Sequence, residues 1–272
     1  MSKKVQEIVT SKIIEALEAG VAPWRKTWKT ARSKNLISGR PYSGANALLT
    51  HPMVTGFKEP SFVTKNQIKQ MGMKVKEGER YIPIIFYGTG KNKETEKSFR
   101  FQRFYPVYNV EQIEGFEISE QREDREEGIN KNAEEIISEW SGKLPIRHGN
   151  HNPCYSPMVD TIFMPEIKSF ESDAEYYSTI FHELTHATGH GSRLNRESVA
   201  SLKRDSHKYS EEELVAELGS AFLCHHTGVE GVFDNQASYC QNWLYALKND
   251  RSIILRAARQ ADKSFKLIIG ES

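Results

Sequence analysis

The residues most able to do chemistry lie in the stretch FHELTHATGH, residues 181–190. It contains the pattern HExxH, with His182 and His186 four positions apart and Glu183 next to the first of them. On a helix, side chains four positions apart project from one face at neighbouring turns, so both imidazoles can bind one metal ion. Glu183 would lie beside them, where it can take a proton from a water that the ion activates and pass it to a leaving amine. The pattern predicts a metallopeptidase with Glu183 as catalytic base.

The helix that carries this pattern has sequence signals at both ends. Ser172 and Glu175 form a capping-box pattern at its start, and Gly189 fits the left-handed position that often follows a helix. Apolar neighbours such as Phe181 and Leu184 predict that the helix is partly buried. HExxH also arises by chance, with its histidines as ordinary helix residues. The defined helix favours the metal site over that alternative.

A site of this kind needs a third protein ligand, and HELTH does not supply it. The extended pattern of one metalloprotease class would place a histidine at position 192, where this chain has Ser192. His190 lies beyond the expected end of the helix, where a structural or substrate-facing role is the better interpretation. The third ligand is therefore expected from another segment.

The downstream segment YSEEELVAELGSAFLCHH, residues 209–226, predicts a second helix. Ser210 fits its N-cap, and Glu213 completes a second capping box, which would give Glu213 a structural role. By helical angles Glu217 borders the apolar face more closely than Glu213 does. We therefore expect Glu217 to join His182 and His186 as the third ligand, with Glu213 as second choice. The expected cofactor is one divalent ion, zinc in the first place and manganese or another divalent metal as the alternative.

The charge is divided unevenly along the chain. Residues 1–110 carry 20 Lys or Arg against 8 Asp or Glu, whereas residues 111–272 carry 17 against 28. A chain divided in this way predicts two modules with different partners, the basic one facing a polyanion. Chance surface charge is the alternative.

The basic half also places aromatic rings beside cations, in PWRKTW at residues 23–28 and in SFRFQRFYPVY at residues 98–108. Cations that follow phosphates and rings that stack on bases hold single-stranded DNA without sequence preference. For the second segment the alternative is an ordinary strand with Phe99, Phe101 and Tyr105 inside and Phe104 on the other face. The candidate DNA-binding residues from these two segments are Trp24, Arg25, Lys26, Trp28, Arg100 and Arg103.

The order of elements predicts an α+β protein of two domains. We expect a helix near the N-terminus, a short helix at 62–72, two strands at 81–88 and 98–110, a helix at 131–140, strands within 154–165, and then several helices. An acidic stretch with few apolar residues fits a linker. The expected boundaries are a basic DNA-binding domain at 1–117, a linker at 118–130 and a metallopeptidase-like domain at 131–272.

Cysteine content and hydropathy predict the compartment. Cys154, Cys224 and Cys240 form no CxxC pair, which fits a reducing environment. The first 20 residues lack the apolar core of a signal peptide, and no run approaches a membrane span. We expect a protein of the bacterial cytoplasm with no membrane partner.

Both halves together resemble the ArdC family of antirestriction proteins, which plasmids and phages encode. The resemblance rests on PWRKTW, NLISGRPYSGANALL, FVTKNQIKQMGMKVKEGE and YPVYNVEQIEG in the first half. In the second half it rests on YSPMVDTIFMP, EYYSTIFHELTHATGHGSRL and YSEEELVAELGSAFL. The resemblance implies an N-terminal domain that binds single-stranded DNA, a C-terminal zincin-like domain, and a role in shielding incoming DNA from host restriction enzymes during conjugation.

Residue by residue, the resemblance implies that His182 and His186 are ligands, Glu183 the base and Glu217 the third ligand. It implies DNA contacts for residues within its motifs, namely Trp24, Arg25, Tyr42 and Asn46. It also implies that YSPMVDTIFMP forms a strand along the cleft edge, where a peptide could pair.

Three functions compete on this basis. The first is a DNA-tethered metallopeptidase that degrades a host restriction or other DNA-processing protein. The second is a single-stranded DNA-binding protein whose metal domain is a scaffold or a surface for protein contacts. The third is metal-assisted DNA hydrolysis, although one HExxH with a glutamate ligand fits peptide hydrolysis better than two-metal phosphodiester chemistry.

Overall fold

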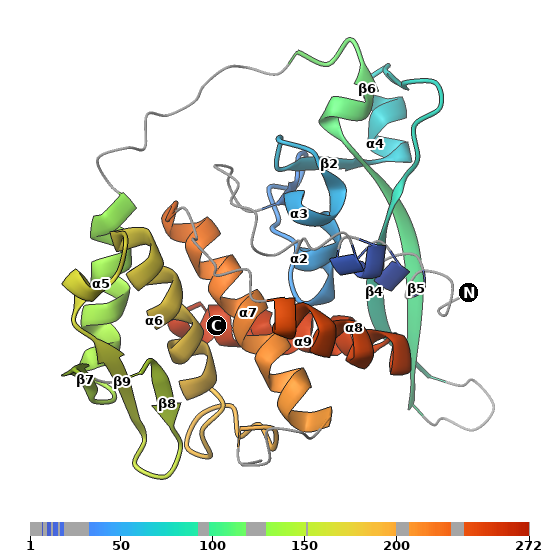
Figure 1. Ribbon diagram of the computed structural model, residues 1–272. Coiled ribbons are helices and arrows are strands. Elements are labelled where there is room, and N and C mark those ends of the chain that lie inside the picture. The colour runs from blue at the N-terminus through green and yellow to red at the C-terminus, as the bar shows by residue number, and fades with distance from the viewer. Residues whose placement is uncertain are drawn as a thin grey trace.

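The protein is described from a computed structural model (Figure 1). The structure describes residues 7, 10–11, 13–15, 17–18, 33–91, 98–117, 129–150, 152–199, 207–229 and 237–271. Helices and strands are mixed in both halves of the chain, as the sequence predicts for an α+β protein.

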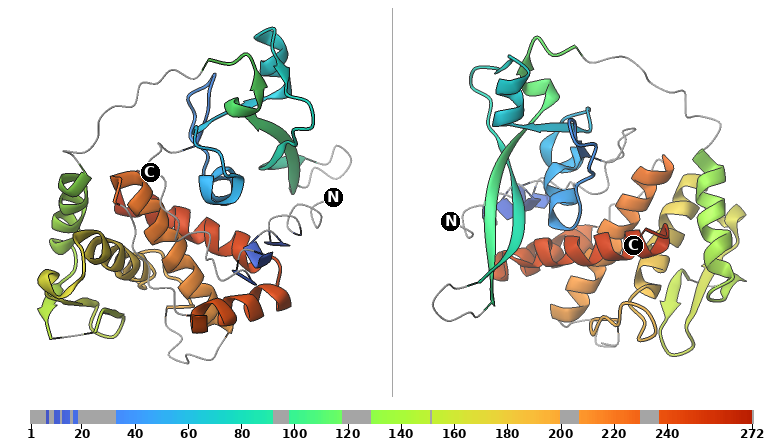
Figure 2. Two further views of the ribbon diagram at one scale, coloured as in Figure 1. Left: turned by 45° about the horizontal axis from the view of Figure 1, so that its top comes forward. Right: turned by 180° about the vertical axis from the view of Figure 1, so that it is seen from behind.

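The first half is built on a four-stranded sheet of order β1-β2-β5-β4. Its long hairpin pairs β4 with β5 from Ile82 opposite Val107 to Lys91 opposite Ser98, and lies on the side of the molecule away from α5 and α6 (Figure 2). The bounds are β1 Lys34–Asn35, α2 Ala45–Thr50, α3 Pro52–Thr55, β2 Ser61–Thr64, α4 Lys65–Gln70, β3 Lys74–Val75, β4 Ile82–Lys91, β5 Ser98–Asn109 and β6 Ile113–Glu114.

Two sequence predictions for this half need correction. The segment predicted as a helix at 62–72 begins as strand β2, and the helix starts only at Lys65. Thr64 marks the boundary because its hydroxyl accepts a hydrogen bond from Gln67 N, while the Gln67 side chain accepts one from Thr64 N. For β5, the interpretation as an ordinary strand placed Tyr105 inside and Phe104 on the other face. The structure shows the reverse, because Phe104 packs against the core and Tyr105 is 43% exposed.

The second half combines a small three-stranded sheet of order β7-β9-β8 with a group of helices. The strands within 154–165 and the helix after the expected linker are confirmed. Of the expected linker, residues 118–128 lie outside the described part, and residues 129–130 already belong to α5. The bounds are α5 Ile129–Ser141, β7 Ile146–Gly149, β8 Cys154–Ser156, β9 Thr161–Pro165, α6 Asp173–Ala187, α7 His207–Thr227, α8 Ala237–Asn249 and α9 Ile253–Ile268.

One hydrophobic core joins the two halves. Leu48 and Leu49 on α2 belong to the same buried cluster as Phe222 on α7 and Phe265 on α9. Ile13, near the N-terminus, is also fully buried in this cluster. The halves are therefore packed together as one body rather than joined only by a tether. Among the helices of the described residues, none has the length and apolarity needed to cross a membrane.

Candidate metal centre

Helix α6 carries the HExxH pattern and begins where the sequence predicts. The Ser172 hydroxyl accepts a hydrogen bond from Glu175 N at 3.2 Å, which caps the helix start. The predicted left-handed Gly189 is wrong, because this residue is not among those with positive φ. Its glycine is needed for space instead, since a Cβ at this position would lie 2.3 Å from Val199 Cγ2 and 2.9 Å from Arg196 Cζ.

Helix α7 begins at His207, three positions before the predicted N-cap. Ser210 and Glu213 therefore lie inside the helix, and the predicted second capping box is wrong. Helix α7 lies very close to α6, because a Cβ on Gly219 would lie 2.4 Å from Thr185 Cγ2 on α6. This short separation brings side chains of both helices to one point.

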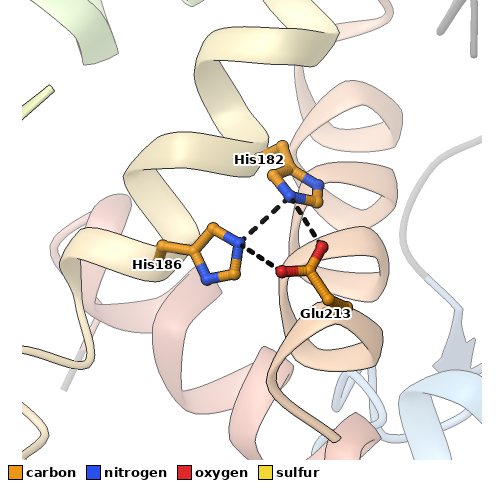
Figure 3. Close-up of side chains that lie close together, drawn as sticks. All are labelled: His182, His186 and Glu213. Atoms are coloured by element: carbon orange, nitrogen blue, oxygen red, sulfur yellow. Dashed lines mark hydrogen bonds and ion pairs between the residues drawn. The ribbon is translucent and has the colours of Figure 1, made fainter. Parts of the chain in front are cut away.

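Three side chains meet between α6 and α7, with their ligand atoms all within 4.8 Å of one another (Figure 3). His182 Nε2 and His186 Nε2 are 3.1 Å apart. Glu213 Oε2 lies 3.7 Å from His182 Nε2, and Glu213 Oε1 lies 3.6 Å from His186 Nε2. The structure thus brings Glu213, the second choice, to the histidines, whereas Glu217 is buried one turn farther along α7 and is not part of this group.

These separations fit a small divalent ion. Two nitrogen ligands and one oxygen ligand at about 2.0–2.2 Å from a tetrahedral ion stand about 3.3–3.5 Å from each other. The 3.1 Å between the two histidine nitrogens lies close to that range. Each nitrogen also has one Glu213 oxygen near it, Oε2 at 3.7 Å from His182 and Oε1 at 3.6 Å from His186. Two imidazoles and a carboxylate are also the donor types that zinc and similar ions take.

The charges around the histidines favour a cation. Burial alone would lower the pKa of His182, but the hydrogen bond to Glu213 and the nearby carboxylates outweigh it and raise this pKa to about 9. For His186, burial is likewise outweighed by the hydrogen bond to Glu212 and the charge of Glu213, so its pKa is raised. A site that holds protons this firmly has an electrostatic field that also attracts a metal ion.

Glu212, which the sequence analysis did not single out, orients His186 through Nδ1, the ring nitrogen that does not face His182 and Glu213. Its Oε1 lies 3.2 Å from His186 Nδ1, so Nδ1 donates and Nε2 keeps its lone pair for the site. Arg196 holds the same carboxylate through its Nη2 at 2.6 Å and its Nε at 3.0 Å, and Ser198 Oγ donates to it at 2.5 Å. Burial raises the pKa of Glu212, but the hydrogen bonds and charges of His186 and Arg196 outweigh it and lower this pKa to about 2.

Glu183 is held by strand β8. Its Oε2 accepts a hydrogen bond from Tyr155 N at 2.6 Å, and the residue is 7% exposed. The Tyr155 hydroxyl donates to Asp160 Oδ1 at 2.7 Å, and Arg193 clamps Asp160 through both carboxylate oxygens. Arg193 Nε also donates to Ala187 O at 2.7 Å, which ties the β8–β9 turn to the end of α6. The carboxylate of Glu183 is therefore fixed beside the two histidines of its own helix.

Comparisons with known proteins agree with this geometry. Residues 131–260 match the family model of a zincin-like metallopeptidase, and residues 3–135 match the N-terminal domain of the anti-restriction factor ArdC. The metal-free crystal structure of the antirestriction protein ArdC from plasmid R388 superposes with a TM-score of 0.79 at 34% sequence identity, over 97% of this chain and 96% of that one. This chain belongs to the ArdC family of antirestriction proteins.

Other members and relatives extend the comparison. The Mn(II)-bound structure of the R388 ArdC has a TM-score of 0.78 at 32% identity and covers 97% of each chain. The uncharacterized protein y4eC of Sinorhizobium fredii is 31% identical over 95% of this chain and 89% of its own length. Two DNA primases TraC of Escherichia coli are 32% and 30% identical, but the chain spans only 27% and 19% of their lengths. The zincin-like half and the Mn(II)-bound relative both indicate a divalent metal ion as cofactor.

Strand β8 of this ArdC-family chain has few backbone donors at its outer edge. Strand β8 lies at the edge of its sheet and pairs with β9 from Cys154 opposite Phe163 to Ser156 opposite Thr161. Pro153 and Pro157 have no N–H, and Tyr155 N–H is donated to Glu183. Residues 153, 155 and 157 therefore offer no N–H to a further strand at this edge. The predicted pairing of a peptide here stays a prediction, and that peptide would have to be the donor.

The residues predicted to contact DNA are distributed between described and undescribed parts of the chain. Trp24, Arg25, Lys26 and Trp28 lie outside the described residues, as does the side chain of Arg100 on β5. Arg103 is exposed on β5.

Two other predicted DNA contacts have roles inside the protein. The amide of Asn46 donates to Ile85 O and accepts from Ile85 N, both at 2.7 Å, which fixes α2 against β4. The ring of Tyr42 is 9% exposed and packs edge-on against Phe62. Both residues therefore support the framework of the first half.

Proposed function

We propose that this ArdC-family protein binds single-stranded DNA, protects incoming DNA from host restriction enzymes, and uses its zincin-like half to cleave a host restriction or DNA-processing protein. The observation that carries the proposal is the meeting of His182, His186 and Glu213 beside a buried Glu183. Burying two imidazoles and two carboxylates at one point costs free energy unless they are paired or coordinate a metal ion. Such a cluster between two helices therefore favours a functional site over a purely structural contact.

In this proposal His182, His186 and Glu213 hold one zinc ion, with manganese as the alternative. When bound, the ion supplies a Lewis acid that polarises a peptide carbonyl and makes water a better nucleophile. Glu183 accepts a proton at its carboxylate and returns it to the leaving amine. The bond from Tyr155 N keeps that carboxylate oriented, and Glu212 keeps His186 in the tautomer that leaves Nε2 as acceptor.

The DNA-binding part of the proposal is supported by the first half. Residues 1–110 carry 20 basic against 8 acidic residues, and residues 3–135 match the N-terminal domain of ArdC. A basic surface attracts a polyanion and makes its binding dependent on salt.

The test is a restriction-protection assay in cells that carry a restriction system, with wild type, Glu183→Gln and Asp173→Asn side by side. Asp173 is an exposed carboxylate on the same helix, so its change to an amide is a matched control. Expression, metal content and binding of a single-stranded oligonucleotide are measured for all three proteins. We expect Glu183→Gln to lose protection while keeping metal and DNA binding, and Asp173→Asn to protect like the wild type.

If Glu183→Gln protects as well as the wild type, the proteolytic part of the proposal is wrong and the zincin-like half is a scaffold. Because the assay also records DNA binding, loss of protection through loss of DNA binding would be recognised separately.

A further inference from the structure

The β4–β5 hairpin carries an open pair of aromatic rings. Phe86 is 50% exposed and Tyr105 is 43% exposed, and their ring centroids lie 6.0 Å apart in an edge-to-face arrangement. In the strand register Arg103 stands directly opposite Phe86, and Arg103 is exposed as well. Two rings and a guanidinium therefore share one patch of the sheet surface.

This patch lies on the face of the hairpin opposite the one that packs against the main hydrophobic core. Ile85 and Phe104 form a cross-strand pair on the opposite face, where they pack against the cluster that includes α2. Among the described residues, the part of the open face nearest β2 is covered, because Tyr42, Phe62 and Val107 form a small separate cluster there. Since side chains alternate between the faces of a strand, Phe86, Arg103 and Tyr105 must point away from the core. Figures 1 and 2 place this hairpin along an outer side of the molecule.

We propose that Phe86, Tyr105 and Arg103 form a binding surface for single-stranded DNA, with bases stacked on the two rings and the guanidinium beside the phosphates. This inference rests on the proposed function and names the site of its DNA-binding part. The charge of the half that carries the patch, 20 basic against 8 acidic residues over 1–110, fits a polyanion. A wholly apolar protein partner would gain nothing from that charge or from Arg103.

The same chemistry explains a preference for single strands. A ring of Phe or Tyr can stack on a base only if the face of that base is accessible, and in a duplex both faces are covered by neighbouring base pairs. Stacking also depends little on base identity, because every base has a π-face. The surface is therefore expected to hold unpaired DNA of any sequence.

The patch is separate from the metal centre. Helix α6 packs on α7, α7 on α9, α9 on α2 and α2 on β4, so several layers stand between the two sites. Variants on the hairpin are thus expected to change DNA binding without changing metal binding.

The experiment measures the affinity of the full chain for a fluorescent oligo-dT, for a duplex of matched length, and the salt dependence of each. The test variant is Phe86→Ala with Tyr105→Ala, and the conservative variant is Phe86→Tyr with Tyr105→Phe, which keeps both rings. Tyr245→Ala is the matched control, because Tyr245 on α8 is 74% exposed but belongs to the acidic half. Thermal unfolding and metal content are recorded to show that each variant is folded.

We expect the double alanine variant to bind oligo-dT at least about tenfold more weakly, and the other two proteins to bind like the wild type. Arg103→Gln is expected to reduce the slope of log affinity against log salt by about 0.7, the value for one phosphate contact on a single strand. If the wild type binds oligo-dT and the double alanine variant binds it equally well, the surface assignment is wrong and the proposed function stands. If the wild type binds no single-stranded DNA, the DNA-binding part of the proposed function fails, and this inference fails with it.

Discussion

At the scale of residues, three consecutive glutamates on α7 take three different roles. Glu211 pairs with Arg256 through both oxygens at 2.9 and 3.2 Å, Glu212 holds His186, and Glu213 faces both histidines of HExxH. Successive helical positions are rotated by about 100°, so neighbouring side chains must point in different directions. The three residues are identical in type, so the sequence does not distinguish them. The rotation of α7 about its axis, relative to α6, decides which of them faces the histidines.

The sequence could not decide whether Glu213 or Glu217 lies beside the two histidines. Residues four apart lie on the same helix face, so helical angles alone hardly separate them. What separates them is the position of α7 along its axis relative to α6, a shift of about one turn or 5.4 Å. That shift is set by contacts between helices, such as Gly219 against Thr185. The histidine pair, by contrast, lies within one helix, and local spacing was enough to predict it.

This geometry predicts different effects for the two carboxylates. Glu213→Gln is expected to lower the affinity for Zn²⁺ or Mn²⁺ by at least about a hundredfold, because it removes the charge of the carboxylate that faces Nε2 of both imidazoles. Glu217→Gln, which keeps the shape of a buried side chain one turn away, is expected to lower it by less than about tenfold. Titration of metal-free protein with either ion, with competition by a chelator, measures both affinities. A larger loss in Glu217→Gln than in Glu213→Gln would restore Glu217 as the ligand.

At the scale of elements, the crossing of α6 and α7 determines the site. Capping signals predicted the start of α6 correctly because Ser172 acts locally, whereas the similar pattern at Ser210 lies inside α7. A capping pattern marks a helix start only where the preceding residues do not continue the helix, and here α7 begins at His207. The strands of the β4–β5 hairpin were predictable as strands, but which face of β5 is buried depends on the packing of α2.

The helix crossing leads to a second prediction. Gly219→Ala would place a Cβ 2.4 Å from Thr185 Cγ2, and Thr185 is fully buried with its hydroxyl bonded to Phe181 O. We expect this change to lower the free energy of unfolding by about 1–3 kcal/mol and to weaken metal binding, since the helices carrying the ligands are pushed apart. Chemical denaturation and metal titration measure the two effects.

Two further variants make this prediction specific. Gly142→Ala, where the new Cβ would meet its nearest neighbour at an ordinary 3.5 Å, should change the free energy of unfolding by less than about 0.5 kcal/mol. Thr185→Ala combined with Gly219→Ala removes the atoms nearest the new methyl group and should recover part of the lost metal affinity. Equal metal affinity in Gly219→Ala and wild type would show that the crossing does not control the site.

At the scale of the whole molecule, the two halves meet around a group of histidines. His51, at the end of α2 in the first half, lies with its ring centroid 5.0 Å from that of His225 and 6.0 Å from that of Phe222, both on α7. A cavity at this junction is lined by His51 and His225 together with His226 and Asp262. The division of charge predicted two modules, but it could not predict this packed junction, because the contacts connect residues far apart in sequence.

This junction makes the stability of the protein depend on pH. Burial first, and the charge of His225 second, lower the pKa of His51 well below its ordinary value of 6.5. Below pH 6.5 the unfolded chain therefore binds a proton at this position and the folded chain does not, so the free energy of unfolding falls as pH drops from 6.5 toward the pKa of the folded state. In the metal-free protein, the raised pKa of His182 acts in another window, where stability falls as pH rises from 6.5 to about 9.

Replacing His51 tests this junction directly. Denaturant unfolding of wild type and His51→Gln between pH 7 and 5 is expected to show a smaller loss of stability in the variant, because its side chain has no proton to gain. Comparing the slopes of the two proteins cancels the contributions of titrating groups that do not interact with His51, while the coupling to His225 remains part of the difference. His148→Gln, at a histidine on β7 outside this junction, is measured in parallel to show what the loss of an imidazole elsewhere does to the slope. Identical slopes for wild type and His51→Gln would show that protonation of His51 does not govern stability in acid. The packing of the two halves would then not depend on the charge of His51.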